Sequence, residues 1–296
     1  MAAIKKTRFD RIFDGVIYFI LGFLTVTYLY VLIFTVSASF SDPNAVYSGR
    51  VILWPVDFTL QGYERVFQEK MVWIGYKNSL IYMVVGTFVS TALTLTGAYA
   101  LSRKDLPGRG FITGILVFTM FFSGGIIPLY LIVRSLGILD TMWAIILPGA
   151  VGMSNVIIAR TFFANSIPNG LLDAARIDGC NNVRFFFRIA LPLSKAIIAV
   201  IALYYAIGYW NDYFNAMIYF KTRTKYPLQL FLREILISSQ TSSAMTGDVL
   251  EQELLAQLQE IIKYTLIVVG SLPLLIIYPF LQKYFVQGVM IGSLKE

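Results

Sequence analysis

Apolar runs of about twenty residues recur along this chain, and each could cross the roughly 30 Å hydrocarbon core of a bilayer as a helix, at about 1.5 Å per residue. Only 14% of the 296 residues are charged, whereas 57% are hydrophobic. Soluble domains have about 25% charged residues, so this chain lacks the charges that would cover a water-facing surface. A membrane β-barrel would show alternating segments of about ten residues instead. The sequence therefore predicts an all-α, polytopic membrane protein.

We expect six transmembrane helices, at about 13–38, 76–101, 111–134, 141–163, 192–219 and 262–284. The first follows a basic N-terminus, but its apolar run is longer than the 7–15 residues or so of a signal peptide, so we expect it to be retained. The run S-G-G-I-I-P at 123–128 predicts a kink in the third span. Close helix packing through small residues is the favoured explanation of these glycines, and a gating hinge is the alternative.

The distribution of lysine and arginine predicts the orientation of the spans. The N-terminal segment and the 102–110 loop are rich in basic residues, as is typical of cytoplasmic segments. We therefore expect both termini and the segment 166–190 to be cytoplasmic, and the segments 39–75 and 220–261 to lie outside. The net charge of +7 agrees with this topology and with contact with anionic lipid; it does not indicate a nucleic-acid partner.

Several kinds of chemistry are excluded by residue types that the chain lacks. It has no histidine and a single cysteine, Cys180, which excludes Ser-His-Asp and Cys-His catalysis, histidine metal sites and an intrachain disulfide. No G-x-x-x-x-G-K-[ST] motif occurs, so the chain has no P-loop for nucleotide phosphates. We expect no bound metal or cofactor and no enzymatic activity, and any use of ATP must reside in another subunit.

A charged stretch, L-D-A-A-R-I-D-G-C-N-N-V-R-F-F-F-R-I-A-L-P at 172–192, interrupts the apolar sequence. Ser166 as a cap and Pro168 in the first turn predict the start of a helix, and Gly179 predicts its left-handed end. Asn181 or Asn182 is expected to cap a second helix, which ends where Pro192 marks the start of the fifth span. The stretch is thus a helix–turn–helix on the cytoplasmic surface. It is either a docking element for a partner or an ordinary interfacial hairpin.

The motif D-A-A-x-x-x-G followed by I-x-L-P resembles the E-A-A…G…I-x-L-P signature of the membrane subunits of bacterial ABC importers. Its residues here are Asp173, Ala174, Ala175, Gly179, Ile189, Leu191 and Pro192. The family's usual glutamate is Asp173, one methylene shorter. The wider run A-A-R-I-D-G, which adds Arg176 and Asp178, the W-N-D at 210–212 and the C-terminal Q-K-Y-F-V-Q-G-V-M-I-G-S-L-K-E are similar to the carbohydrate branch. The whole chain resembles MalG-like permease subunits of the LplC/YtcP type.

This resemblance implies the fold of a type I ABC importer permease in a bacterial inner membrane. It implies that residues 168–180 include a coupling helix that docks on an ATPase subunit, where ATP and Mg²⁺ would be bound. The implied partners are a second permease, two ATP-binding cassette subunits, an extracellular or periplasmic solute-binding protein and an oligosaccharide. The tail, with Gly288, Gly292 and Ser293, would reach the ATPase subunits; a position on the membrane surface is the alternative.

Polar residues inside membrane spans are candidates for a transport path. The candidates here are Tyr209, Trp210, Asn211, Asp212 and Asn215 in the fifth span, with Asn155 and Tyr130 as weaker ones. Aromatic faces and amides suit sugars, but an aromatic belt at the membrane interface explains the cluster equally well. The resemblance also implies that a partner permease supplies most sugar contacts. Import of another solute, such as a polyamine or a phosphonate, and a membrane-embedded enzyme are the less favoured alternatives.

Overall fold

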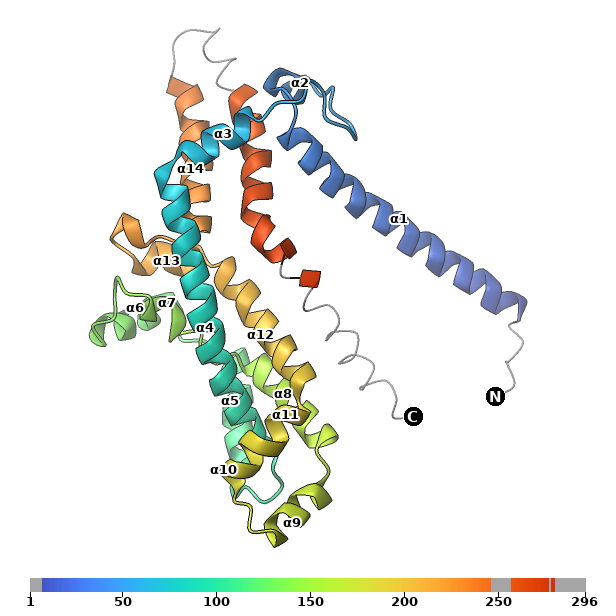
Figure 1. The fold of residues 1–296 in the computed structure, drawn as a ribbon, viewed down its shortest axis with the longest axis vertical. Coiled ribbons are helices and arrows are strands. Elements are labelled where there is room, and N and C mark those ends of the chain that lie inside the picture. The colour runs from blue at the N-terminus through green and yellow to red at the C-terminus, as the bar shows by residue number, and fades with distance from the viewer. Residues whose placement is uncertain (1–6, 246–256, 277, 280–296) are drawn as a thin grey trace. The chain divides into compact units, whose positions relative to one another are not determined.

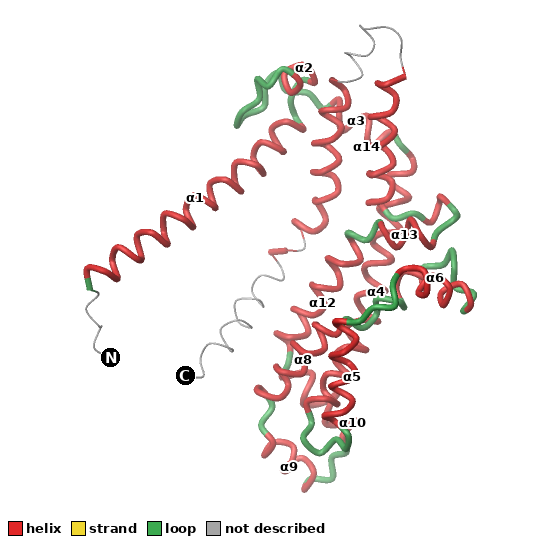
Figure 2. The backbone as a smooth tube through the Cα atoms, turned by 180° about the vertical axis from the view of Figure 1, so that it is seen from behind, coloured by secondary structure: helices red, strands yellow, loops and turns green. Residues whose placement is uncertain are grey.

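The computed structural model describes residues 7–245, 257–276 and 278–279, and all regular elements within these ranges are helices (Figures 1 and 2). The chain divides into two compact units. Unit 1 consists of Met1–Glu69 and Arg233–Ser271, and unit 2 of Lys70–Leu232 and Leu272–Glu296.

Unit 1 begins with the long helix α1 (Arg8–Ser39), followed by α2 (Pro43–Tyr47) and α3 (Gln61–Gln68). Thr7 and Asp10 form a reciprocal capping box that satisfies free backbone N–H groups at the start of α1. The helix Gln257–Ile276 packs against α3 at Gly62, where an added Cβ would collide with Thr265. A glycine is therefore needed at this crossing.

Unit 2 is built around α4 (Lys70–Ser102), which packs most extensively against α12 (Lys195–Trp210) and α8 (Met153–Ser166). The other elements that begin in this unit are α5 (Arg109–Phe121), α6 (Ile126–Ser135), α7 (Trp143–Ile146), α9 (Asn169–Ile177), α10 (Asn182–Phe185), the π-helix η1 (Phe186–Ala190), α11 (Leu191–Leu193), α13 (Phe214–Tyr219), the 3₁₀-helix η2 (Arg223–Lys225) and α14 (Leu228–Met245), which continues into unit 1. Figure 1 shows α12 lying beside one part of the longer helix α4.

The contact between α4 and α12 combines small residues with hydroxyl groups. A Cβ built on Gly86 would lie 2.7 Å from the Tyr209 ring, so glycine permits the close approach. One turn further along α4, the Ser90 and Tyr209 hydroxyls lie 2.7 Å apart, and the Thr94 and Tyr205 hydroxyls lie 2.6 Å apart. Small residues and interhelical hydrogen bonds are the usual means by which helices associate in membranes. The pattern is what a lipid-embedded helix pair requires.

The predicted spans are only partly continuous helices. Among the described residues, three helices are long and apolar enough to cross a membrane, Phe9–Ser39, Lys70–Ser102 and Gln257–Ile276, or up to five if each of two bent helix pairs is one span. The predicted fourth span, 141–163, is divided into α7 and α8 by an irregular segment that includes Pro148, Gly149 and Gly152. The expectation of one helix there is wrong, because proline and glycine break the hydrogen-bond ladder. The count of six spans stays a prediction.

The S-G-G-I-I-P run produces a sharper break than a kink. Helices α5 and α6 meet at 115°, and Gly125 lies between them with φ +87°, a conformation that favours glycine. A Cβ added to Gly125 would contact nothing within 4 Å, and one on Gly124 would meet only Pro128 at 3.9 Å. Neither glycine lies at a close helix contact within this chain, and the backbone conformation at Gly125 favours glycine; close packing against another subunit stays a prediction. The hinge stays a prediction.

Candidate functional site: a coupling surface and an outer clamp

The charged stretch folds into the predicted helix–turn–helix. Helix α9 has Pro168 at its N-cap position, and Gly179 ends it with φ +74° while the Cys180 N–H donates to the Ala175 carbonyl at 2.9 Å. The Asn181 side chain accepts from the Arg184 N–H at 2.8 Å and caps α10. Ser166 is the last residue of α8, so its predicted role as the cap of α9 is wrong.

The two faces of α9 differ sharply. Leu172 and Ala175 are 8% exposed and pack against the chain itself, whereas Asp173, Ala174 and Asp178 are exposed. Ile177 is 86% exposed. Ala175 faces inward, so of the two alanines of the motif only Ala174 lies on the outward face. The outward face offers a small residue and a large apolar one, a combination that suits an interface core.

An aspartate in the neighbouring loop fixes α9 to the end of α4. Asp105 accepts from Arg103 at 2.8 Å and from Arg176 of α9 at 2.6 Å. These two arginines hold the pKa of the Asp105 carboxyl well below its ordinary range, because hydrogen bonds to the charged form favour it. Nearby, the Tyr99 ring packs on Phe186 with centroids 4.9 Å apart. Residues 168–192, which we call the coupling segment after the role that the resemblance implies, are thus attached to α4 by charge and by aromatic packing.

The I-x-L-P part of the motif forms a bend. Proline lacks an N–H and interrupts the regular ladder, and here the chain widens into the π-helix η1 before α11. The helices on the two sides of Ser194 meet at 84°. Ile189 and Leu191 are half-buried, and Pro192 is exposed. The predicted start of the fifth span is Pro192. Helix α12 begins three residues later, at Lys195.

The predicted substrate residues of the fifth span separate into two groups. Tyr209 is buried, and its hydroxyl is hydrogen-bonded to Ser90 and donates to the Ile146 carbonyl at 3.2 Å. Trp210 is 0% exposed. Both side chains hold the helices together, and a role for either in contacting substrate is not supported by this geometry. Asn211 remains exposed after α12, although its amide donates to the Ile207 carbonyl at 3.0 Å.

The remaining candidates are partly used within the chain. Asp212 accepts from the Asn215 N–H at 3.1 Å and from the Asn215 amide at 2.9 Å, and so closes the turn between α12 and α13. Tyr130 is half-buried and stacks on Tyr219 at 6.3 Å. Asn155 is half-buried in α8, beside Gly152. Among the described hydrogen bonds, none joins Tyr130 or Asn155 to the W-N-D turn at 210–212. Gly288, Gly292 and Ser293 lie outside the described residues.

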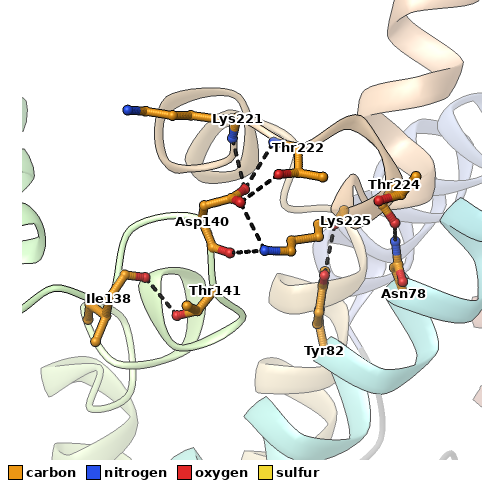
Figure 3. Close-up of polar contacts among 9 residues, drawn as sticks. All are labelled: Asn78, Tyr82, Ile138, Asp140, Thr141, Lys221, Thr222, Thr224 and Lys225. Atoms are coloured by element: carbon orange, nitrogen blue, oxygen red, sulfur yellow. Dashed lines mark hydrogen bonds and ion pairs between the residues drawn. The ribbon is translucent and has the colours of Figure 1, made fainter.

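A second aspartate, which the sequence analysis missed, organises the opposite end of unit 2 (Figure 3). Asp140 accepts from the Lys221 and Thr222 N–H groups at 3.0 Å, from the Thr222 hydroxyl at 2.6 Å and from the Lys225 ammonium at 2.9 Å. Burial opposes its ionisation, but these hydrogen bonds outweigh burial and hold the pKa of Asp140 below its ordinary range. We call Asp140 with Lys221, Thr222 and Lys225 the outer clamp, after the side on which the sequence analysis expects these loops.

The outer clamp is anchored to α4. The Tyr82 hydroxyl donates to the Lys225 carbonyl at 2.8 Å, and the Asn78 amide donates to the carbonyls of Thr224 and Tyr226. Asp140 has φ +56°, which is uncommon for a residue other than glycine but is tolerated by aspartate. A sequence signal existed, since an isolated aspartate follows Gly137 in the short loop between two predicted spans. Nothing in the sequence indicated the hydrogen-bond partners of Asp140, which lie about 80 residues away along the chain.

The described residues include no group of three histidine, cysteine, aspartate or glutamate side chains that could hold a metal ion. No family model matches the sequence. The chain is 44% identical over 288 residues to the "Polygalacturonan/rhamnogalacturonan transport system permease protein YtcP" of Bacillus subtilis (strain 168), with 97% of this chain and 99% of that protein covered. This chain belongs to the permease family of sugar ABC transporters.

Two further comparisons agree with this assignment. The permease is 40% identical over 290 residues to "Protein LplC" of the same organism, which covers 98% of this chain and 97% of that one. It also matches a chain in the crystal structure of "a bacterial ABC transporter involved in the import of the acidic polysaccharide alginate", with a TM-score of 0.82, 35% identity, and coverage of 96% of this chain and 100% of that chain. The permease is thus an integral membrane transport subunit and not an enzyme.

Proposed function

We propose that this permease forms half of the translocation pore of an ATP-driven oligosaccharide importer and couples ATP hydrolysis to alternating access. The observation that carries the proposal is the coupling segment. It presents Ala174 and Ile177 outward while Arg176 and Asp105 attach it to α4. A partner that moves α9 would therefore move the central helix of unit 2.

The partner of this surface is a soluble ATPase. The chain has no P-loop of its own, so ATP and Mg²⁺ are bound by two separate cassette subunits. A second permease completes the pore, and an extracellular or periplasmic binding protein delivers the substrate. The loop held by the outer clamp begins the stretch 220–261 that we place outside, on the side of that binding protein.

Carbohydrate is the substrate class that the relatives support. YtcP is described as serving polygalacturonan and rhamnogalacturonan transport, and the solved transporter as serving alginate import; polygalacturonan and alginate are chains of uronic acids. We therefore place acidic oligosaccharides first among the substrates to test. Reconstituted importer with its cognate binding protein should show stimulated ATP hydrolysis and uptake with an oligosaccharide. Stimulation by polyamines or phosphonates alone, with no response to any sugar in a neutral and acidic panel, would overturn the substrate assignment.

Both termini and the coupling segment face the cytoplasm in this proposal. The basic residues of the N-terminus and of the 102–110 loop support this orientation. The pairing of loops supports the grouping by side, because Asp105 and Arg176 join two segments that we place inside, and Asp140 and Lys225 join two that we place outside.

Cysteines at Lys221 and at Lys104 test the orientation, in a background with Cys180 replaced by serine. Both positions are exposed. A membrane-impermeant thiol reagent should label the Lys221→Cys variant in intact cells, and the Lys104→Cys variant only after the membrane is opened. The opposite pattern would invert the topology.

A further inference from the structure

The segment that follows α1 folds back onto the last turn of that helix. The Ser37 hydroxyl donates to the Leu53 carbonyl at 2.6 Å, and the Asp42 N–H donates to the Val56 carbonyl at 3.1 Å. The Thr59 N–H donates to the Phe40 carbonyl at 2.9 Å. A small core of Ala38, Ala45 and Val51 lies beneath these hydrogen bonds. The position of the segment along α1 is therefore fixed.

The outer side of this segment is a set of exposed apolar side chains, which we call the apolar tip. Its members are Ile52, Leu53, Trp54 and Phe58. Trp54 is 79% exposed and Phe58 is 69% exposed. Arg50 lies beside the tip, is exposed, and donates to the Ser48 hydroxyl at 3.2 Å. Adjacent exposed apolar side chains of this size mark an interaction surface.

The length of α1 determines the depth at which the apolar tip lies. Asp10, Arg11 and Asp14 occupy its first two turns, so its hydrocarbon segment begins after Asp14. A hydrocarbon core of about 30 Å takes about twenty residues at 1.5 Å per residue, which places its far boundary near Phe34. Ser37 is about 4.5 Å further along the axis. The headgroup region of one leaflet is about 5–7 Å thick, so Ser37, and with it Leu53, lies within that region.

We propose that the apolar tip inserts into the interface of the lipid bilayer and anchors the outer end of α1. Tryptophan and phenylalanine with aliphatic neighbours are the side chains that membrane interfaces favour. The Arg50 guanidinium is placed to bind lipid phosphate, to which anionic headgroups add further attraction. Figures 1 and 2 show the tip's loop directly at the end of α1. The inference goes beyond transport and holds for either orientation of the permease.

Site-directed spin labelling in the assembled importer tests the occupant of the tip. Trp54→Cys and, as a water-exposed control on α2, Asn44→Cys are labelled in a cysteine-free complex in nanodiscs of phosphatidylethanolamine and phosphatidylglycerol. The label at position 54 should collide severalfold more with oxygen, which partitions into lipid, than with a water-soluble nickel complex. The label at 44 should show the reverse. High nickel accessibility at 54 would mean water, and low accessibility to both reagents would mean cover by protein; either result overturns the proposal.

A second measurement leaves the tip intact. The chain contains four tryptophans, and nanodiscs with lipids brominated near the headgroup should quench more fluorescence in the native permease complex than in its Trp54→Phe variant. Equal quenching in the two proteins would place Trp54 away from lipid. This comparison remains valid even if the cysteine variant of Trp54 fails to assemble.

Discussion

Replacing Ile177 with aspartate is expected to abolish transport and binding-protein-stimulated ATP hydrolysis while the permease still inserts into the membrane. Ile177 is the most exposed large apolar residue of the coupling segment, at 86%. An apolar anchor at the centre of an interface contributes about 2 kcal/mol or more, which is roughly thirtyfold in affinity. A buried carboxylate without a partner adds a further cost. The measurement is ATP hydrolysis with and without loaded binding protein, with the ATPase retained on purification as a second readout.

Two control variants define this result. Ile177→Leu keeps the apolar volume and should retain stimulated hydrolysis. Val183→Asp places the same charge on another exposed apolar residue of the cytoplasmic segment, on α10, and should have the smaller effect. Ala174→Trp should resemble Ile177→Asp because Ala174 shares the outward face. Native stimulation in the Ile177→Asp complex would show that this face of α9 does not dock on the ATPase.

Replacing Asp140 with alanine is expected to detach the 220–227 loop and to uncouple the binding protein from ATP hydrolysis. The change removes the acceptor of two backbone N–H groups, of the Thr222 hydroxyl and of the Lys225 ammonium. It also places alanine at φ +56°, a conformation that aspartate tolerates better. Lost charge-assisted hydrogen bonds and left-handed strain together should lower the free energy of unfolding by about 2–3 kcal/mol. Thermal unfolding of the purified complex measures this loss.

Two further substitutions separate the causes. Asp140→Gly relieves the backbone strain but removes the hydrogen bonds, whereas Asp140→Asn keeps a neutral acceptor and tolerates the positive φ. If the clamp acts through its hydrogen bonds, the glycine variant should need more binding protein for half-maximal stimulation, and the asparagine variant should be nearly native. Basal hydrolysis should be unchanged in both. A glycine variant with native binding-protein dependence would restrict Asp140 to a structural role.

Hydropathy and composition were sufficient for the fold class, and local signals were sufficient for the helix–turn–helix of α9 and α10. Gly179 ends α9 and Asn181 caps α10, as the local sequence predicted. Left-handed glycines and asparagine caps depend only on the neighbouring backbone. Ser166 did not follow its prediction, and Ala175 does not lie on the outward face of α9, since the end of α8 and the inward face of α9 are set by packing. The breaks at Gly125 and Pro148 show the same limit: hydropathy indicates an apolar segment but not whether it is one helix.

The polar residues of the fifth span were ambiguous for a different reason. A tyrosine and a tryptophan in an apolar helix are equally typical of a sugar path and of helix packing, and only the tertiary contacts distinguish these roles. Tyr209 is bound to Ser90, 119 positions away. The Asp140 clamp was missed for the same reason, because its partners come from a distant loop. Long-range pairing is the information that a single sequence does not contain.

Helix α4 is attached to the outer clamp at one end and to the coupling segment at the other. The number of residues between these two attachments is therefore constrained. Tyr82 faces the outer clamp and Tyr99 faces the coupling segment, so their relative direction around the helix axis must be preserved. Insertion of one residue between them would rotate one attachment by about 100° relative to the other. Two added turns would restore the direction but separate the ends by roughly 10 Å. Outside the contact made by Gly86, Ser90 and Thr94, substitutions can therefore accumulate along the middle of α4 in related permeases, whereas insertions and deletions there should be absent.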